Sequence, residues 1–243
     1  MRMQVRSWNK WNECEKILES KLMIFYKLEF GYEESCIEGS ESNDWEGIVC
    51  TADPRHQRAG RRVTTLHLGI TGSKLTDFSR TLLDFVITDH ALTVLKTAGL
   101  TGFTVKPTVI DSYPKGFDPQ SIPKLWELQV TGWGGMAPVE SGMQLIKSCS
   151  ACGSLKYSGT EHVEQILDET QWDGSDFFFV WPLPKYIFVT ERAAKIIHDK
   201  QLTGVRLLNS SELGQVEGAS PGRLHYYLPE AHAHELGDPL GIY

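Results

Sequence analysis

Two cysteines three positions apart are the residues best suited to chemistry in this sequence. Cys149 and Cys152 lie in the run Cys-Ser-Ala-Cys-Gly, which ends at Gly153. Two thiolates at this spacing can bind one tetrahedral zinc ion, and the glycine permits the tight turn after the second ligand. A structural zinc site has four ligands, so further donors must come from elsewhere in the chain.

An internal repeat indicates where those donors lie. Residues 87–107 align without a gap to residues 189–209. Thr88 and Thr190 each follow an apolar run and precede an acidic residue, which is the pattern of a helix N-cap. Each copy then has apolar residues at helical spacing and ends in Leu-Thr-Gly, so we expect strand–helix–strand in both.

The repeat extends upstream, with small gaps, into the cysteine run. Cys50 aligns with Cys149 and Asp53 aligns with Cys152, so the first copy reads Cys-x-x-Asp, followed closely by His56. The fourth ligand is therefore Asp53 by repeat symmetry, or His56 because imidazole is the commoner partner of thiolates.

Three hypotheses describe this cluster. Zinc is held by Cys50, Cys149, Cys152 and either His56 or Asp53; or the first half has decayed and the site binds nothing; or Cys149 and Cys152 form a redox pair. The zinc hypothesis requires the sulfurs of Cys50 and Cys149 to approach within about 4 Å.

The elements around these residues predict an α+β fold with two tandem related modules, offset by about 100 residues. We expect an amphipathic helix over 1–21, a first module over 22–110 and a proline-rich linker over 111–123. A second module is expected over 124–210 and an extended tail over 211–243.

Local patterns predict the strands and a basic loop. Phe177–Trp181 reads as a buried core strand, and the arginine-rich run 55–62 as a solvated loop that pairs with nearby acids. Strands are expected at 23–30, 63–70, 103–110, 125–131, 143–148, 176–181, 204–208 and 223–228.

Composition narrows the class of protein. The 243 residues carry a formal charge of −7, which disfavours nucleic acid and anionic membrane surfaces as partners. No apolar run reaches the length of a membrane helix, no signal peptide is evident, and five cysteines fit a reducing compartment, so we expect a cytoplasmic protein. The nucleophile-elbow, zinc-protease, P-loop and dinucleotide motifs are absent, so we expect a non-catalytic protein.

The chain resembles the bacterial double-CXXCG motif proteins, some of which are described as immunity proteins against polymorphic toxins. The resemblance rests on the run 149–153, the strand 125–128 before it and the stretch 176–208 after it, and Cys-Thr-Ala-Asp-Pro stands where the first CXXCG would be. It implies a binding protein that neutralises a cognate toxin, and the acidic charge would attract a basic partner. The alternatives are a structural zinc adaptor and a CxxC redox protein.

Overall fold

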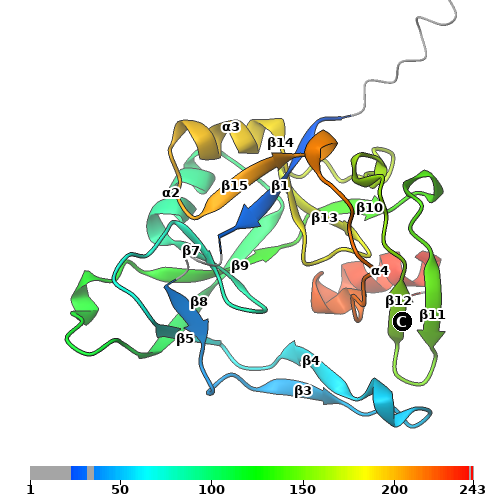
Figure 1. Cartoon of the computed structure of the whole chain (residues 1–243), viewed down its shortest axis with the longest axis horizontal. Helices are drawn as coiled ribbons and strands as arrows, with labels where there is room; N and C mark the ends of the chain where they lie inside the picture. The colour runs from blue at the N-terminus through cyan, green and yellow to red at the C-terminus, as the bar shows by residue number, and fades with distance from the viewer. Residues whose placement is uncertain (1–22, 32–35, 241, 243) are drawn as a thin grey trace, which may run out of the picture.

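The computed structural model describes residues 23–31, 36–240 and 242, and it mixes helices with sheets as expected for an α+β protein (Figure 1). The helix predicted over 1–21 lies outside these residues. Among the described residues, no helix is both long and apolar enough to cross a membrane.

Two larger sheets form the body of the molecule. The first, in spatial order, contains β2 (Ile37–Gly39), β5 (Leu66–Ile70), β8 (Phe103–Ser112), β9 (Leu125–Val130), β7 (Phe85–Thr88) and β6 (Phe78–Arg80). The second contains β10 (Trp133–Met136), β13 (Phe177–Trp181), β14 (Ile187–Thr190), β1 (Phe25–Phe30) and β15 (Val205–Asn209). Neighbouring strands are antiparallel except for the parallel pairs β5–β8 and β10–β13.

The two repeat helices begin where the sequence predicts. Helix α2 (Asp89–Thr97) follows β7 and α3 (Glu191–Asp199) follows β14. The hydroxyls of Thr88 and Thr190 accept hydrogen bonds from the third backbone amide of each helix, at 3.2 and 3.3 Å. Both N-caps are thus confirmed.

The first strand of each predicted module pairs within the other half of the chain. β1 lies between β14 and β15, whereas β9 lies between β7 and β8. Phe30 faces Val205 across one pair of strands, and Val130, its counterpart in the repeat, faces Phe103 across the other. The segment 111–123, expected to be a linker, contributes its first two residues to β8 and then forms the loop of the β8–β9 hairpin.

Matching hydrogen bonds tie the halves together at the helix ends. The Asp77 carboxylate accepts from the amide and hydroxyl of Thr203, both at 3.0 Å. The Asp176 carboxylate accepts from the amide and hydroxyl of Thr101, at 3.0 and 3.3 Å. Each half therefore supplies the carboxylate that accepts hydrogen bonds from the turn after the helix of the other half.

One hydrophobic cluster lies beneath both helices. It combines Leu95 and Leu128 with Phe177 and Ile197, all at most 2% exposed. The predicted core strand Phe177–Trp181 is buried throughout, which confirms that expectation. Residues from both predicted modules thus share one core.

Two small hairpins extend from this body. One pairs β3 (Trp45–Ile48) with β4 (Arg58–Arg62), and the other pairs β11 (Leu145–Cys149) with β12 (Ser154–Tyr157). Figure 1 shows the β3–β4 hairpin as an arm along one edge of the molecule, with its tip beside β11–β12. No residue of β3 or β4 is fully buried, so packing holds this arm only weakly.

The C-terminal segment differs from the expectation. The strand predicted at 223–228 is wrong, because this stretch forms a single 3-10 turn, and the tail expected to be extended contains helix α4 (Glu230–Leu240). Pro221 and Pro229 supply no backbone donor to a strand ladder, and the alanine- and glutamate-rich residues after Pro229 favour a helix. Single 3-10 turns occur at η1 (Pro54–His56), η2 (Pro119–Ser121), η3 (Val139–Ser141), η4 (Val163–Gln165), η5 (Ser210–Glu212) and η6 (Leu224–Tyr226).

Candidate metal centre

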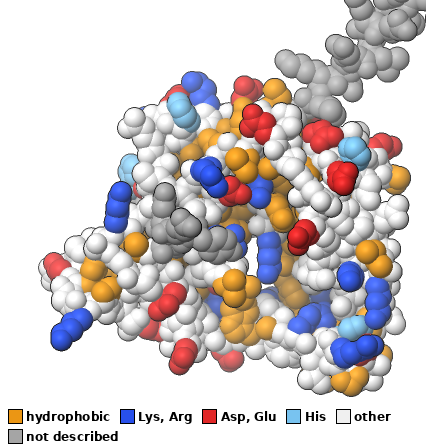
Figure 2. Space-filling view, in the orientation of Figure 1, with side chains coloured by type: hydrophobic (Ala, Val, Ile, Leu, Met, Phe, Trp, Pro, Cys, Tyr) orange, Lys and Arg blue, Asp and Glu red, His pale blue; other side chains and the backbone are white. Residues whose placement is uncertain are grey.

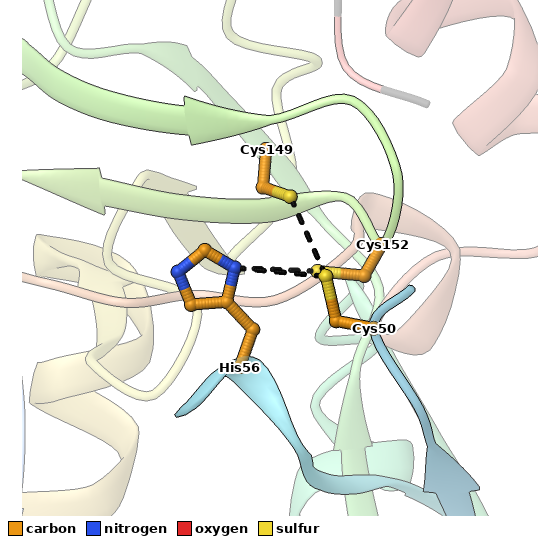
Figure 3. A group of neighbouring side chains, drawn as sticks. All are labelled: Cys50, His56, Cys149 and Cys152. Carbon is orange, nitrogen blue, oxygen red and sulfur yellow. Dashed lines mark hydrogen bonds between the residues drawn. The ribbon is translucent and has the colours of Figure 1, made fainter. Parts of the chain in front are cut away.

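Four potential ligands from the two small hairpins meet at the tip of the β3–β4 arm (Figure 3). Cys50 and His56 lie in the loop that joins β3 to β4. Cys149 ends β11, and Cys152 lies in the turn that leads into β12. The arrangement brings together residues that are up to 99 positions apart in the chain.

Tight turns position the donors. Gly153 has φ +65, and its amide donates to the carbonyl of Cys149 at 2.8 Å. This hydrogen bond closes the tight turn that the glycine was expected to permit. On the other hairpin, the Asp53 carboxylate caps η1 by accepting from the Arg55 amide at 3.0 Å. His56 is the last residue of this short turn and is thereby directed at the sulfurs.

The distances suit a tetrahedral metal ion. Cys50 Sγ lies 3.7 Å from Cys149 Sγ, which meets the requirement set from the sequence. His56 Nδ1 lies 3.8 Å from the sulfurs of both Cys50 and Cys152, and all four donor atoms lie within 4.8 Å of one another. Zinc–sulfur bonds near 2.3 Å at tetrahedral angles separate two sulfurs by about 3.8 Å. The four residues therefore lie close enough to hold one ion.

The geometry distinguishes the two candidates for the fourth ligand. His56 contributes Nδ1 to the cluster, whereas Asp53 lies behind the imidazole, with its carboxylate 3.6 Å from Nε2. Arg55 also pairs with this carboxylate at 2.9 Å and holds the pKa of Asp53 well below its usual range. Asp53 thus lies beside the ring and is hydrogen-bonded to Arg55, outside the group of donor atoms.

Arg58 lies beside the cluster and favours the thiolate form of one cysteine. Arg58 donates to Cys152 Sγ at 3.5 Å and to its carbonyl oxygen at 3.0 Å. This guanidinium is the main reason that the pKa of Cys152 is lowered to about 6. Burial instead raises the pKa of Cys50. Cys152 therefore offers a thiolate at neutral pH, the form that binds metals.

Burial and donor type determine what the cluster can do. Cys50 and Cys152 are 5% and 2% exposed, and three thiolates with one imidazole would complete the shell of a tetrahedral ion. A complete set of protein ligands leaves no position for a substrate, which is the pattern of structural rather than catalytic zinc. Cys36 is a free thiol outside this group, and Cys14 lies outside the described residues.

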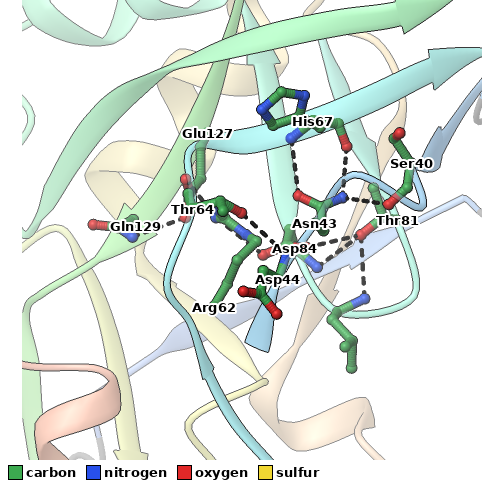
Figure 4. A network of polar contacts seen from close by, with 11 residues as sticks. Ser40, Asn43, Asp44, Arg62, Thr64, His67, Thr81, Asp84, Glu127 and Gln129 are labelled. Carbon is green, nitrogen blue, oxygen red and sulfur yellow. Dashed lines mark hydrogen bonds and ion pairs between the residues drawn. The ribbon is translucent and has the colours of Figure 1, made fainter. Parts of the chain in front are cut away.

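The arginine-rich run is only partly the solvated loop that the sequence suggested. Arg55 does pair with a nearby acid, but residues 58–62 form strand β4. Arg62 is 8% exposed, and its guanidinium lies 2.6 Å from Glu127 and 3.5 Å from Asp84 (Figure 4). Composition alone did not identify Arg58 as a cysteine partner; only its position two residues beyond His56 gave a signal.

Comparison with known proteins adds no relative. No protein-family model matches the chain, and no curated protein is significantly similar to it.

Proposed function

We propose that Cys50, His56, Cys149 and Cys152 bind one structural zinc ion. The single observation that carries this proposal is the convergence of three sulfurs and one imidazole nitrogen within 4.8 Å. Three thiolates and an imidazole prefer zinc over the harder magnesium or calcium ions. The ion would join two hairpins that otherwise share little packing.

The role of the ion follows from the position of the cluster. An isolated two-stranded hairpin is marginally stable in water, and neither strand of the β3–β4 arm contains a fully buried residue. A metal at its tip fixes the arm to β11–β12 at one point. Zinc binding then contributes directly to the stability of this part of the fold.

We further propose that the chain is a non-catalytic, immunity-type protein that binds a cognate protein toxin in the cytoplasm. The resemblance of residues 149–153 and their surroundings to the double-CXXCG proteins supports this role. A complete ligand set is compatible with it, because a binding protein needs no open coordination position. Reduced thiols, which zinc binding requires, suit a reducing compartment.

An internal duplication is part of the proposal. The equal registers of β1 and β9 and the equivalent Asp–Thr contacts support two copies of one ancestral module. The Cys-x-x-Asp run would then be a changed CXXC in which His56 replaces the lost thiolate.

Two measurements test the two parts separately. Elemental analysis of the purified chain should find about one zinc ion per molecule, and Cys149→Ser should lose it. A metal-free protein in which Cys50, Cys149 and Cys152 are all reduced would overturn the zinc assignment. For the partner, co-expression with a toxin found encoded beside this gene should protect cells and yield a co-purified complex. Neither protection nor a complex would overturn the immunity role.

A further inference from the structure

A groove of about 790 Å³ lies between the β3–β4 arm and the body of the molecule. One wall is formed by residues 58–63 of the arm, and the opposite side by the face of β8 and β9. Residues 220–230 close a third side. In Figure 2, lysine and arginine side chains lie among hydrophobic and some acidic ones near the centre of the face shown.

The groove has the opposite charge to the chain as a whole. Arg58, Arg61, Lys106 and Lys185 line it, and the last three are exposed. Three acids also line it: Asp84 and Glu127 pair with Arg62, and Glu230 lies on the third side, so the positive side chains outnumber the negative ones. On a chain of net charge −7, this is a local concentration of positive charge. It favours an acidic occupant.

The groove also presents an unpaired strand edge. Within the described part of the chain, β4 has β3 as its single strand neighbour. Six consecutive residues, 58–63, line the groove. Side chains alternate between the faces of a strand, so a run of consecutive lining residues is compatible with a strand that turns its edge toward the groove, beside Trp45 of β3. Such an edge can pair with an added extended segment.

The arm is anchored at both ends of this edge. At its base, Arg62 contacts Glu127 of β9 at 2.6 Å. At its tip, Cys50 and His56 meet Cys149 and Cys152, and Arg58 donates to the Cys152 carbonyl. Both anchors therefore help to keep the groove wall in position.

We propose that this groove binds an extended acidic segment of a partner protein along the edge of β4, and that the metal centre is required to hold the binding surface in place. The inference rests on the proposed function for the zinc ion and for a protein partner. Apolar lining residues such as Phe85 and Val130, together with the strand edge, favour a peptide over a nucleic acid. The partner would be acidic where it meets the groove, although net charge alone suggested a basic one.

Peptide binding to the zinc-loaded protein tests this inference. The probes are fluorescent ten-residue peptides with alternating glutamate and valine, in both registers, with a lysine–valine peptide as the matched control. Fluorescence anisotropy should show saturable binding of an acidic peptide that weakens with salt, and amides of residues 58–62 should become protected from hydrogen exchange. No binding by either acidic peptide up to about 1 mM, or binding without protection of β4, would overturn the proposal.

Matched variants separate the groove from general charge effects. Lys106→Glu/Lys185→Glu should weaken binding roughly tenfold, because each reversal replaces an exposed attraction by a repulsion. Lys74→Glu/Lys115→Glu changes the net charge equally at exposed loop positions outside the groove and should leave affinity within about twofold. Equal losses in both variants would refute a specific site.

Zinc dependence and competing ligands complete the test. Chelation, or Cys149→Ser, should reduce peptide binding by more than tenfold while the sheets remain folded by circular dichroism. Unchanged binding after proven zinc loss would overturn the role of the metal centre. Tighter binding of a ten-nucleotide single strand than of the peptides would identify a nucleic-acid site and refute the proposal. A zinc-loaded chain that binds its toxin but no acidic peptide would refute this inference alone.

Discussion

The buried ion network at the base of the arm gives a quantitative prediction. Arg62 is 8% exposed and Glu127 6% exposed at their side chains, and Asp84 is 14% exposed. Arg62→Met removes the one cation from this network and leaves two carboxylates facing each other in a place with little water. Breaking a buried pair by deleting one partner costs about 3–5 kcal/mol, because the remaining charge is uncompensated. The double variant Arg62→Met/Glu127→Leu should recover most of this loss.

The pH dependence of the loss has a definite sign. Burial raises the pKa of Asp84, and Arg62 opposes that rise. Removing Arg62 therefore raises the pKa further above its value in the unfolded chain. A carboxyl with a raised pKa binds its proton more tightly in the folded state, so stability falls as pH increases from the unfolded pKa through the folded one. The penalty in Arg62→Met should thus shrink when the pH is lowered from about 7 to about 5.

Urea unfolding and thermal melting measure both effects. For a chain of this length, a loss of 3–5 kcal/mol lowers Tm by about 10 °C. Arg62→Lys is the matched control, since it keeps a cation and should lose much less. A loss below about 1 kcal/mol in Arg62→Met, or an equal loss in Arg62→Met and the double variant, would refute the reasoning.

Three further predictions concern other parts of the fold. Gly204→Ala should destabilise the fold by about 3 kcal/mol or more in urea unfolding, because Gly204 has φ +87 and an added Cβ would collide with the Phe78 carbonyl. Gly116→Ala is the control: Gly116 has φ +81 but open space around it, so the substitution should cost only about 1 kcal/mol. Burial raises the pKa of Asp77, but hydrogen bonds led by the Thr203 amide outweigh it and lower the net pKa. The ionised Asp77 carboxylate therefore stabilises the folded state above the unfolded pKa near 4, and this stabilisation is lost as the pH falls through the folded pKa. Asp77→Asn should cost about 1–2 kcal/mol near pH 7 and almost nothing near pH 2. Chelation of zinc should increase hydrogen exchange in β3–β4 and β11–β12 while α2 and α3 stay protected.

The sequence predicts the local elements of this fold better than their partners. Most of the expected strands are found within a few residues of their ranges, whereas short strands such as β3 and β4 of the arm were not expected. The caps at Thr88 and Thr190 follow directly from residue type. Alternation specifies which face of a strand is buried, but it does not specify the neighbouring strand. The exchange of β1 and β9 between the halves therefore depends on long-range pairing that no local pattern contains.

The candidate site shows the same contrast between local features, which the sequence predicts, and long-range contacts, which it does not. Repeat alignment brought Cys50 to Cys149, and ligand chemistry favoured His56 over Asp53; both expectations agree with the cluster. The role of Arg58 was not predicted: its position two residues after His56 places it near the cluster, but nothing in the basic run indicates contact with a cysteine 94 residues away. Contacts between distant segments become visible only when the hairpins are placed in space.

The exchanged strands and the metal-linked arm imply two levels of stability. Each sheet contains a strand from the other half, and residues of both halves share one buried cluster, so loss of either half removes a central strand from what remains. We expect the body to unfold in one cooperative step for this reason. The two strands of the arm contain no fully buried residue, and the arm is held at its base and at its tip, so we expect it to detach without disrupting the body. Zinc would then control a binding surface on a body whose fold does not depend on the ion.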